Sequence, residues 1–205
     1  MNMRALLVAT LCFGSALSFA AETTDELVQR AVEAAGGKDK LPTLFRIKEV
    51  FHFGDKPEPP EGKKRSTRVS VLEAPKFWWV GGKDRTGEPA KFDVWAWTLV
   101  ALLDDGTKKE VIPDVVESDR PAFGLRLTGA IEPQMDIYFD RETGALVRMD
   151  WRGDIYRYSE IRESEGFKYP AKCIIFKAAG GKPWFFHEIT ELERLTELPA
   201  GIKRE

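Results

Sequence analysis

The sequence predicts a mainly β (α+β) protein in which a large antiparallel sheet is combined with one main helix. Short apolar segments with period-two alternation follow one another along most of the chain, and turn residues such as Gly and Asp separate them. A clear helical pattern lies near the start. The short connections favour antiparallel neighbours, because a parallel crossover needs about a dozen residues or more.

The helical pattern begins at a capping box formed by Thr23 and Glu26. Gly36 and Gly37 are expected to end this helix. The apolar residues between these limits recur at helical spacing, which is typical of one short amphipathic helix. They are Leu27, Val28, Ala31, Val32, Ala34 and Ala35.

The first predicted strand runs from Phe45 to Phe53 and has one apolar face and one polar face. Phe45, Ile47, Phe51 and Phe53 make the apolar face, and Arg46, Lys48 and His52 the polar one. Four residues of the segment 55–64 that follows are Pro or Gly among charged residues, which predicts an exposed loop.

Further strands are predicted along the rest of the chain. Their ranges are 69–71, 77–80, 92–103, 123–127, 135–139, 146–151, 155–161, 169–177 and 184–195. The range 92–103 is ambiguous, because a continuous apolar run does not reveal its period. We favour a strand there because Trp95, Trp97, Thr98 and Val100 are aromatic or β-branched.

The first twenty residues are typical of a secretory signal peptide. Arg4 precedes an apolar run from Ala5 to Phe13, and small residues lead to a cleavage site near Ala20. The run is too short to span a bilayer, which takes about 20 apolar residues. We therefore expect a periplasmic or secreted protein, residues 21–205, that is not an integral membrane protein.

The composition excludes several classes of function. Lys and Arg number 31 against 33 Asp and Glu, so the charge excess that nucleic-acid binding requires is missing. Two His and two Cys cannot assemble a zinc cluster by themselves, and we expect neither a metal nor a cofactor. After signal cleavage Cys173 is the remaining cysteine, so no intramolecular disulfide is expected.

The candidates for catalysis are few, and we expect a protein that is not an enzyme. Ser159 lies in no nucleophile elbow. Cys173 and His187 lie in neighbouring predicted strands, but a buried thiol is more often inert packing than a nucleophile. The acidic residues Asp104, Asp105, Asp114 and Asp119 lie beside turn residues without calcium-loop spacing, which indicates solvated turns.

Large apolar side chains are the candidates for ligand contact. Trp95 and Trp97 would share one face of a strand, and adjacent Trp78 and Trp79 would point to opposite faces. The strand that begins near Trp184 carries apolar residues on both faces, which must both be covered. The predicted ligand-binding residues are Trp78, Trp95, Trp97, Phe123, Leu125, Met135, Ile137, Trp184 and Phe186. Ordinary core packing is the alternative for all nine.

Four pieces of the chain resemble the LolA-like family, the periplasmic carriers that sort outer-membrane lipoproteins. They are Ala35-Gly36-Gly37 with Leu41 and Leu44, the stretch from Tyr138 to Arg148, Tyr158-Ser159-Glu160 with Glu165 to Pro170, and Gly181-Lys182 before the closing strand. The resemblance implies a single domain over residues 21–205: a strongly curved antiparallel sheet that forms an incomplete β-barrel, with the N-terminal helix as a lid over an apolar cavity for acyl chains. The loop 55–64 departs from the family pattern.

Two functions follow from these observations. The first is a carrier or sensor that is not an enzyme and shields a lipid, an acyl chain or another apolar molecule in the concave face of the sheet. The alternative is a cell-envelope interaction module on the same scaffold, with an envelope protein as partner bound around loop 55–64. Sugar recognition by an exposed Trp78 or Trp79 is a third, weaker hypothesis.

Overall fold

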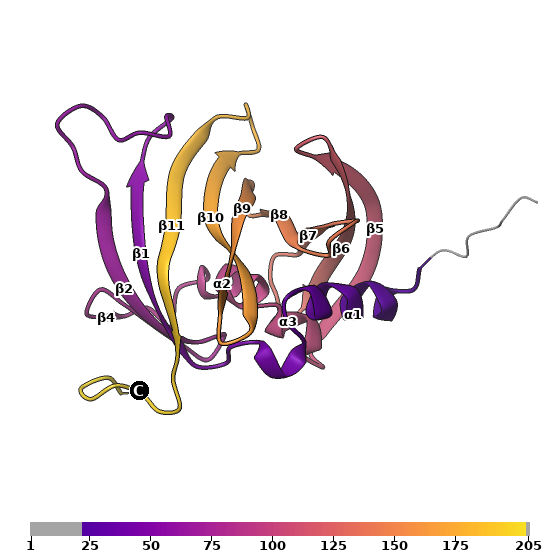
Figure 1. Cartoon of the computed structure of the whole chain (residues 1–205), viewed down its shortest axis with the longest axis horizontal. Helices are drawn as coiled ribbons and strands as arrows, with labels where there is room; N and C mark the ends of the chain where they lie inside the picture. The colour runs from indigo at the N-terminus through magenta and orange to yellow at the C-terminus, as the bar shows by residue number, and fades with distance from the viewer. Residues whose placement is uncertain (1–21, 204–205) are drawn as a thin grey trace, which may run out of the picture.

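A computed structural model describes residues 22–203, and about half of them lie in one strongly curved antiparallel sheet (Figure 1). The helical elements of this part of the chain are α1 (Thr24–Ala34), the short 3-10 turn Lys38–Lys40, α2 (Lys91–Trp97) and α3 (Val100–Leu103). The strands are β1 (Phe45–Phe53), β2 (Ser66–Glu73), β3 (Phe77–Val80), β4 (Lys83–Asp84), β5 (Thr107–Glu117), β6 (Arg120–Gly129), β7 (Met135–Asp140), β8 (Leu146–Trp151), β9 (Asp154–Ser164), β10 (Phe167–Lys177) and β11 (Pro183–Arg194). The predicted mainly β class and the open half-barrel are confirmed.

The sheet consists of two meanders that meet through the first and last strands. Its order is β4-β3-β2-β1-β11-β10-β9-β8-β7-β6-β5, and every neighbouring pair is antiparallel. β1 pairs with β11 from Phe45 opposite Arg194 to Phe53 opposite Phe185, with a bulge between Lys48 and Glu49. Figure 1 shows the sheet bending from β2 round to β5, with the helices in the lower part of the trough.

The predicted N-terminal helix is confirmed, and its capping box forms as expected. The Thr23 side chain accepts a hydrogen bond from the Glu26 backbone N–H, and the Glu26 carboxylate accepts one from the Thr23 backbone N–H. Leu27, Ala31 and Val32 form the buried face of α1 and belong to the main apolar core. The helix therefore covers part of the concave face of the sheet.

The prediction of a strand over 92–103 was wrong, because this segment forms α2 and α3. Leu99, with a left-handed backbone φ of 61°, separates the two helices. Trp95, Ala96 and Trp97 are buried in succession, since the segment lies inside the trough and protein surrounds it on several sides. Burial on several sides leaves few polar residues in this segment. The sequence therefore lacks the polar–apolar pattern that distinguishes a helix from a strand. Trp95 and Trp97 consequently do not share a face.

Strand β5 was missed, and Asp114 lies within it rather than in a turn. β5 is an edge strand that pairs with β6 alone. Its register shifts between Ile112 and Val115, around Pro113, which cannot donate a ladder hydrogen bond. Proline and exposed charged residues hide the alternating pattern of β5. Such residues are common on edge strands, where they prevent pairing with another chain.

The half of the trough formed by β5–β8 is filled with side chains. Six residues of β6 and β7 in the main core are at most 1% exposed: Phe123, Leu125, Leu127, Met135, Ile137 and Phe139. Helices α1 and α3 contribute Leu27, Ala31 and Leu102 to the same core. This half of the molecule is therefore a packed interior.

The predicted signal peptide, residues 1–20, lies outside the described residues. Within residues 22–203, no helix has the length and apolar character needed to cross a bilayer.

Gly36 joins the end of α1 to the turn between β9 and β10 by a close backbone approach. Its φ is +107°, and a Cβ there would lie 2.0 Å from the Gly166 carbonyl oxygen. Gly37, with φ +92°, has open space around the same position. We expect Gly37→Ala to cost about 1–3 kcal/mol of backbone strain, and Gly36→Ala a further ~1–3 kcal/mol from overpacking. Urea unfolding of both variants measures the difference, and equal losses would contradict the close approach.

Candidate functional site

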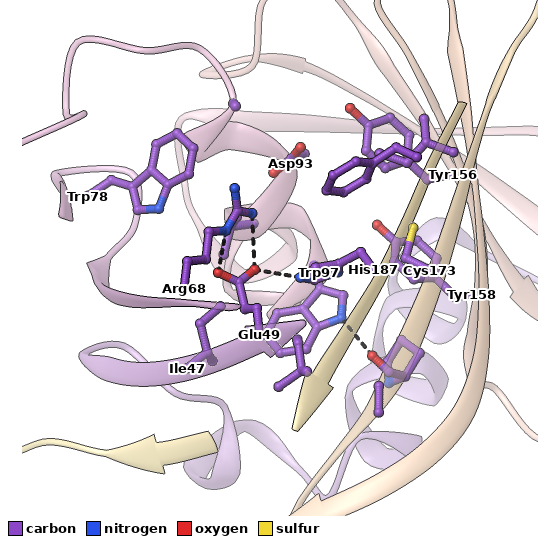
Figure 2. A pocket seen from close by; sticks show the side chains of 17 residues that line it. Ile47, Glu49, Arg68, Trp78, Asp93, Trp97, Tyr156, Tyr158, Cys173 and His187 are labelled. Carbon is purple, nitrogen blue, oxygen red and sulfur yellow. Dashed lines mark hydrogen bonds and ion pairs between the residues drawn. The ribbon is translucent and has the colours of Figure 1, made fainter. Parts of the chain in front are cut away.

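A cavity of about 190 Å³ lies between α2 and the part of the sheet formed by β1, β2, β3, β9, β10 and β11 (Figure 2). Its wall is mainly apolar. The large apolar side chains that line it are Ile47, Trp78, Val94, Trp97, Ile175, Phe185 and Ile189. A partly enclosed, mainly apolar cavity with a few polar groups is the usual form of a small-molecule site.

Glu49 is the central polar residue of this cavity. It follows Phe45 and Ile47 at period two in β1, so its side chain points to the concave face, where it is 3% exposed. Arg68 donates hydrogen bonds to it from Nε (2.7 Å) and Nη2 (3.1 Å), and Ser70 donates one from Oγ (2.9 Å). His187 Nε2 lies 2.5 Å from Glu49 Oε1. Figure 2 shows Arg68 and His187 converging on the Glu49 carboxylate.

The surroundings of Glu49 keep it ionised although it is buried. Burial alone raises the pKa of a carboxyl group. Hydrogen bonds and charge from His187 and Arg68 outweigh that effect and lower the pKa of Glu49 to about 2. A buried carboxylate is stable only when donors satisfy it in this way. Glu49, Arg68, Ser70 and His187 therefore form a cluster on the concave face in which the Glu49 carboxylate is fully hydrogen-bonded.

Asp93 is the second carboxyl group of the cavity and has a different environment. It lies on α2, and Figure 2 shows its carboxylate near Arg68 and Tyr156. Removal from water raises the pKa of Asp93 to about 7, against the opposing effects of a Tyr156 hydrogen bond, the Arg68 charge and the Val94 N–H. Within residues 22–203, no ion pair joins Asp93 to a Lys, Arg or His.

Cys173 and His187 lie opposite each other on β10 and β11 and both line the cavity. Burial raises the pKa of the Cys173 thiol well above its ordinary value, and the charge of Asp93 adds to this effect. Across the described part of the chain, no hydrogen bond joins Cys173 to His187, whose Nε2 is bound to Glu49. The thiol is therefore protonated, which does not suit a nucleophile.

Two of the nine predicted ligand-binding residues, Trp78 and Trp97, line the cavity. Trp97 donates a hydrogen bond from Nε1 to the Pro170 carbonyl oxygen (3.2 Å). Trp95 is buried in the main core. Phe123, Leu125, Met135 and Ile137 fill the β5–β8 half of that core.

Neither Trp184 nor Phe186 lines this cavity. Trp184 lies at a register shift between β10 and β11 and packs beside Phe185 and Phe53. Phe186 lies on the opposite face of β11. Phe186 stacks on His52, with ring centroids 4.8 Å apart. Phe185, His187 and Ile189 point into the cavity instead. The opposite directions of Phe186 and of Phe185, His187 and Ile189 follow strand alternation, but the periodicity alone could not tell which face was concave.

Sequence reasoning missed Glu49, Arg68, Asp93 and His187 as a group. One signal was available: Glu49 is the single charged residue in the alternating apolar series of β1. A charge at a core-facing position indicates either a buried partner or a functional site. Its partners come from β2 and β11, whose proximity depends on the pairing of distant strands.

Comparison with solved structures shows that the chain has the LolA-like fold. A LolA superfamily protein from Nitrosomonas europaea aligns with a TM-score of 0.54 at 11% identity, over 87% of this chain and 96% of that one. A putative outer membrane lipoprotein-sorting protein domain from Vibrio parahaemolyticus aligns at 0.53 and 9% identity, over 85% and 93%. A DUF1329 family protein from Desulfovibrio piger aligns at 0.53 and 10% identity, over 87% and 96%. No family model and no curated protein matches the sequence.

We expect Glu49→Gln to destabilise the protein by about 3 kcal/mol near pH 7, because it removes the anion from a buried ion pair. The pKa of Glu49 in the folded protein lies below its ordinary value of 4.5, so its ionised form stabilises the fold above pH 4.5. That contribution is lost as the pH falls from 4.5 toward 2. The difference between wild type and variant should therefore shrink between pH 7 and pH 3 in urea unfolding.

The matched control is Glu191→Gln, which removes one partner of the exposed pair with Lys48 in the same two strands. Exposed pairs contribute about 0–1 kcal/mol. Equal losses in the two variants would show that the Glu49 cluster does not stabilise the sheet.

Proposed function

We propose that this protein is a carrier or sensor of a small, mainly apolar molecule, that it is not an enzyme, and that it acts in the periplasm or is secreted. The cavity between α2 and the concave face is the observation that carries this proposal. The LolA-like fold supports it, because a solved neighbour is named as a putative lipoprotein-sorting domain. The predicted signal peptide supports the location.

The size of the cavity limits what the protein would carry. Sites for drug-sized ligands usually measure about 300–1,000 Å³, and this one measures about 190 Å³. The β5–β8 half of the trough is already filled by its own side chains. The proposed ligand is therefore a compact molecule, or one end of a lipid or acyl chain, held by burial worth about 25 cal/mol per Å² of apolar surface.

Helix α2 is the proposed moving element. It is seven residues long and contributes Asp93, Val94 and Trp97 to the cavity wall. α1 contributes none of the lining residues. Displacement of α2 would open the cavity without separating any pair of strands.

We expect Val94→Trp to fill the cavity and weaken ligand binding at least tenfold, because the larger side chain occupies the space beside Trp97. The measurements are organic extraction with mass spectrometry of the purified protein, and titration with a small apolar fluorescent probe. Val116→Trp is the matched control, since Val116 is 72% exposed and lies on the edge strand β5. No extracted molecule and no probe binding by the wild type would end the carrier proposal.

An interaction module is the second candidate, and an exposed aromatic side chain, Phe53, favours it. Phe53, at the end of β1, is 62% exposed and lies 5.0 Å from Phe185 and 6.1 Å from Trp184 between ring centroids. The loop 55–64 follows directly. An exposed aromatic side chain beside a loop is a usual anchor for a protein partner.

If the protein binds an envelope protein there, Phe53→Ser should reduce cross-linking to that partner in cells at least fivefold and leave the folded protein unchanged in urea unfolding. Deletion of residues 55–64 should have the same effect. Unchanged cross-linking in both variants would dismiss this candidate.

A further inference from the structure

We propose that the ligand of this cavity carries a protonated amine and that Asp93 binds it, among the aromatic rings of Trp78, Trp97 and Tyr156. The proposal rests on the carrier function and names the chemical class of the ligand. It follows from a difference between the two carboxyl groups that line the same cavity: Glu49 has an ion-pair partner in the protein, and Asp93 has none among the described residues.

The first step is that Glu49 needs nothing from a ligand. Its two oxygens receive hydrogen bonds from Arg68 and Ser70 and contact His187. Two of the nitrogen atoms of Arg68 are used in this pair. The charges of Glu49 and Arg68 therefore compensate each other inside the protein.

The second step is that Asp93 lacks such compensation. Its hydrogen-bond partners are the neutral Tyr156 hydroxyl and the Val94 N–H, and the charge of Arg68, which is hydrogen-bonded to Glu49, acts on it from nearby. No Lys, Arg or His of residues 22–203 forms an ion pair with it. Asp93 is half-buried, and a partly desolvated carboxylate without an ion-pair partner is stabilised by a cation that enters from the cavity.

The third step is the character of the wall around Asp93. Trp78, Trp97 and Tyr156 line the same cavity as Asp93. Figure 2 shows Trp78 and Tyr156 on either side of Asp93, with Arg68 beside the carboxylate and the Trp97 indole below. The faces of aromatic rings attract ammonium groups, by about 2 kcal/mol or more where water is excluded. A carboxylate in a cavity with aromatic walls can bind the charged group of an amine, while the rings contact its apolar substituent.

The other titratable groups of the cavity set the pH dependence. They are Glu49 on β1, Arg68 on β2, Tyr156 and Tyr158 on β9, Cys173 on β10 and His187 on β11. Burial raises the pKa values of Tyr156, Tyr158 and Cys173, so these three groups are neutral near pH 7. Because Asp93 has a pKa of about 7, its anion forms as the pH rises through neutrality. Amine binding should strengthen in the same direction.

The test compares three probes with the same apolar part: 2-phenylethylamine, 2-phenylethanol and 3-phenylpropanoate. Binding is measured by calorimetry and by quenching of tryptophan fluorescence at pH 5.5 and pH 8. We expect the amine to bind wild type at least tenfold more tightly than either other probe at pH 8. Its affinity should fall about tenfold or more at pH 5.5, as Asp93 takes up a proton.

Asp93→Asn retains the size of the side chain and removes its charge. In this variant the advantage of the amine and most of its pH dependence should disappear, whereas 2-phenylethanol should bind as in wild type. Asp84→Asn, on the exposed strand β4, is the matched control and should behave as wild type.

The outcomes separate this proposal from the carrier function. Equal affinities for the three probes, tighter binding of 3-phenylpropanoate, or undiminished amine binding by Asp93→Asn would overturn the amine proposal. In each of these cases, loss of probe binding in Val94→Trp would still support the cavity as a binding site. Failure of all three probes to bind wild type would overturn both proposals.

Discussion

The hydrogen-bonded carboxylate of Glu49 is the constraint on which the sheet and its cavity depend. The residue sits at a core-facing position of β1, so its charge must be compensated by protein groups. The compensating groups come from both neighbouring strands: Arg68 and Ser70 from β2, and His187 from β11. A shift of either strand by one residue would turn these donors to the convex face. The cluster thus selects one register on both sides of β1, including the seam where the two meanders meet.

The same cluster explains why one half of the trough is hollow and the other solid. In the β5–β8 half, the concave positions of β6 and β7 carry buried apolar side chains that form one core with residues of α1 and α3. In the other half, the polar groups of Glu49, Arg68 and His187 occupy concave positions. These positions therefore carry no large apolar side chain that could fill the space beneath α2. The cavity is a consequence of where the charges lie along β1, β2 and β11.

The sequence predicted the elements whose signals are local. The capping box of Thr23 and Glu26 marked the start of α1, and period-two alternation marked β1 and most strands after Pro121. It failed where the environment removed the pattern: α2 is buried on several sides, and β5 is interrupted by Pro113 at the sheet edge. The pairing of β1 with β11 has no local signal at all. Because the cavity wall depends on that pairing, the sequence could supply Trp78 and Trp97 as candidates, but not the group around Glu49.

The helical form of α2 gives the site its second wall. Ala90, Asp93, Val94 and Trp97 line the cavity, and their spacing of three and four residues places them along one side of a helix. In a strand, Asp93 and Val94 would have pointed to opposite faces. The helix therefore places Asp93 within an apolar stripe. It faces a sheet whose cavity-lining acid, Glu49, is already paired with Arg68. The paired carboxylate of Glu49 fixes the strands, and the unpaired carboxylate of Asp93 is left for recognition, so that stability and binding are assigned to different residues of one cavity.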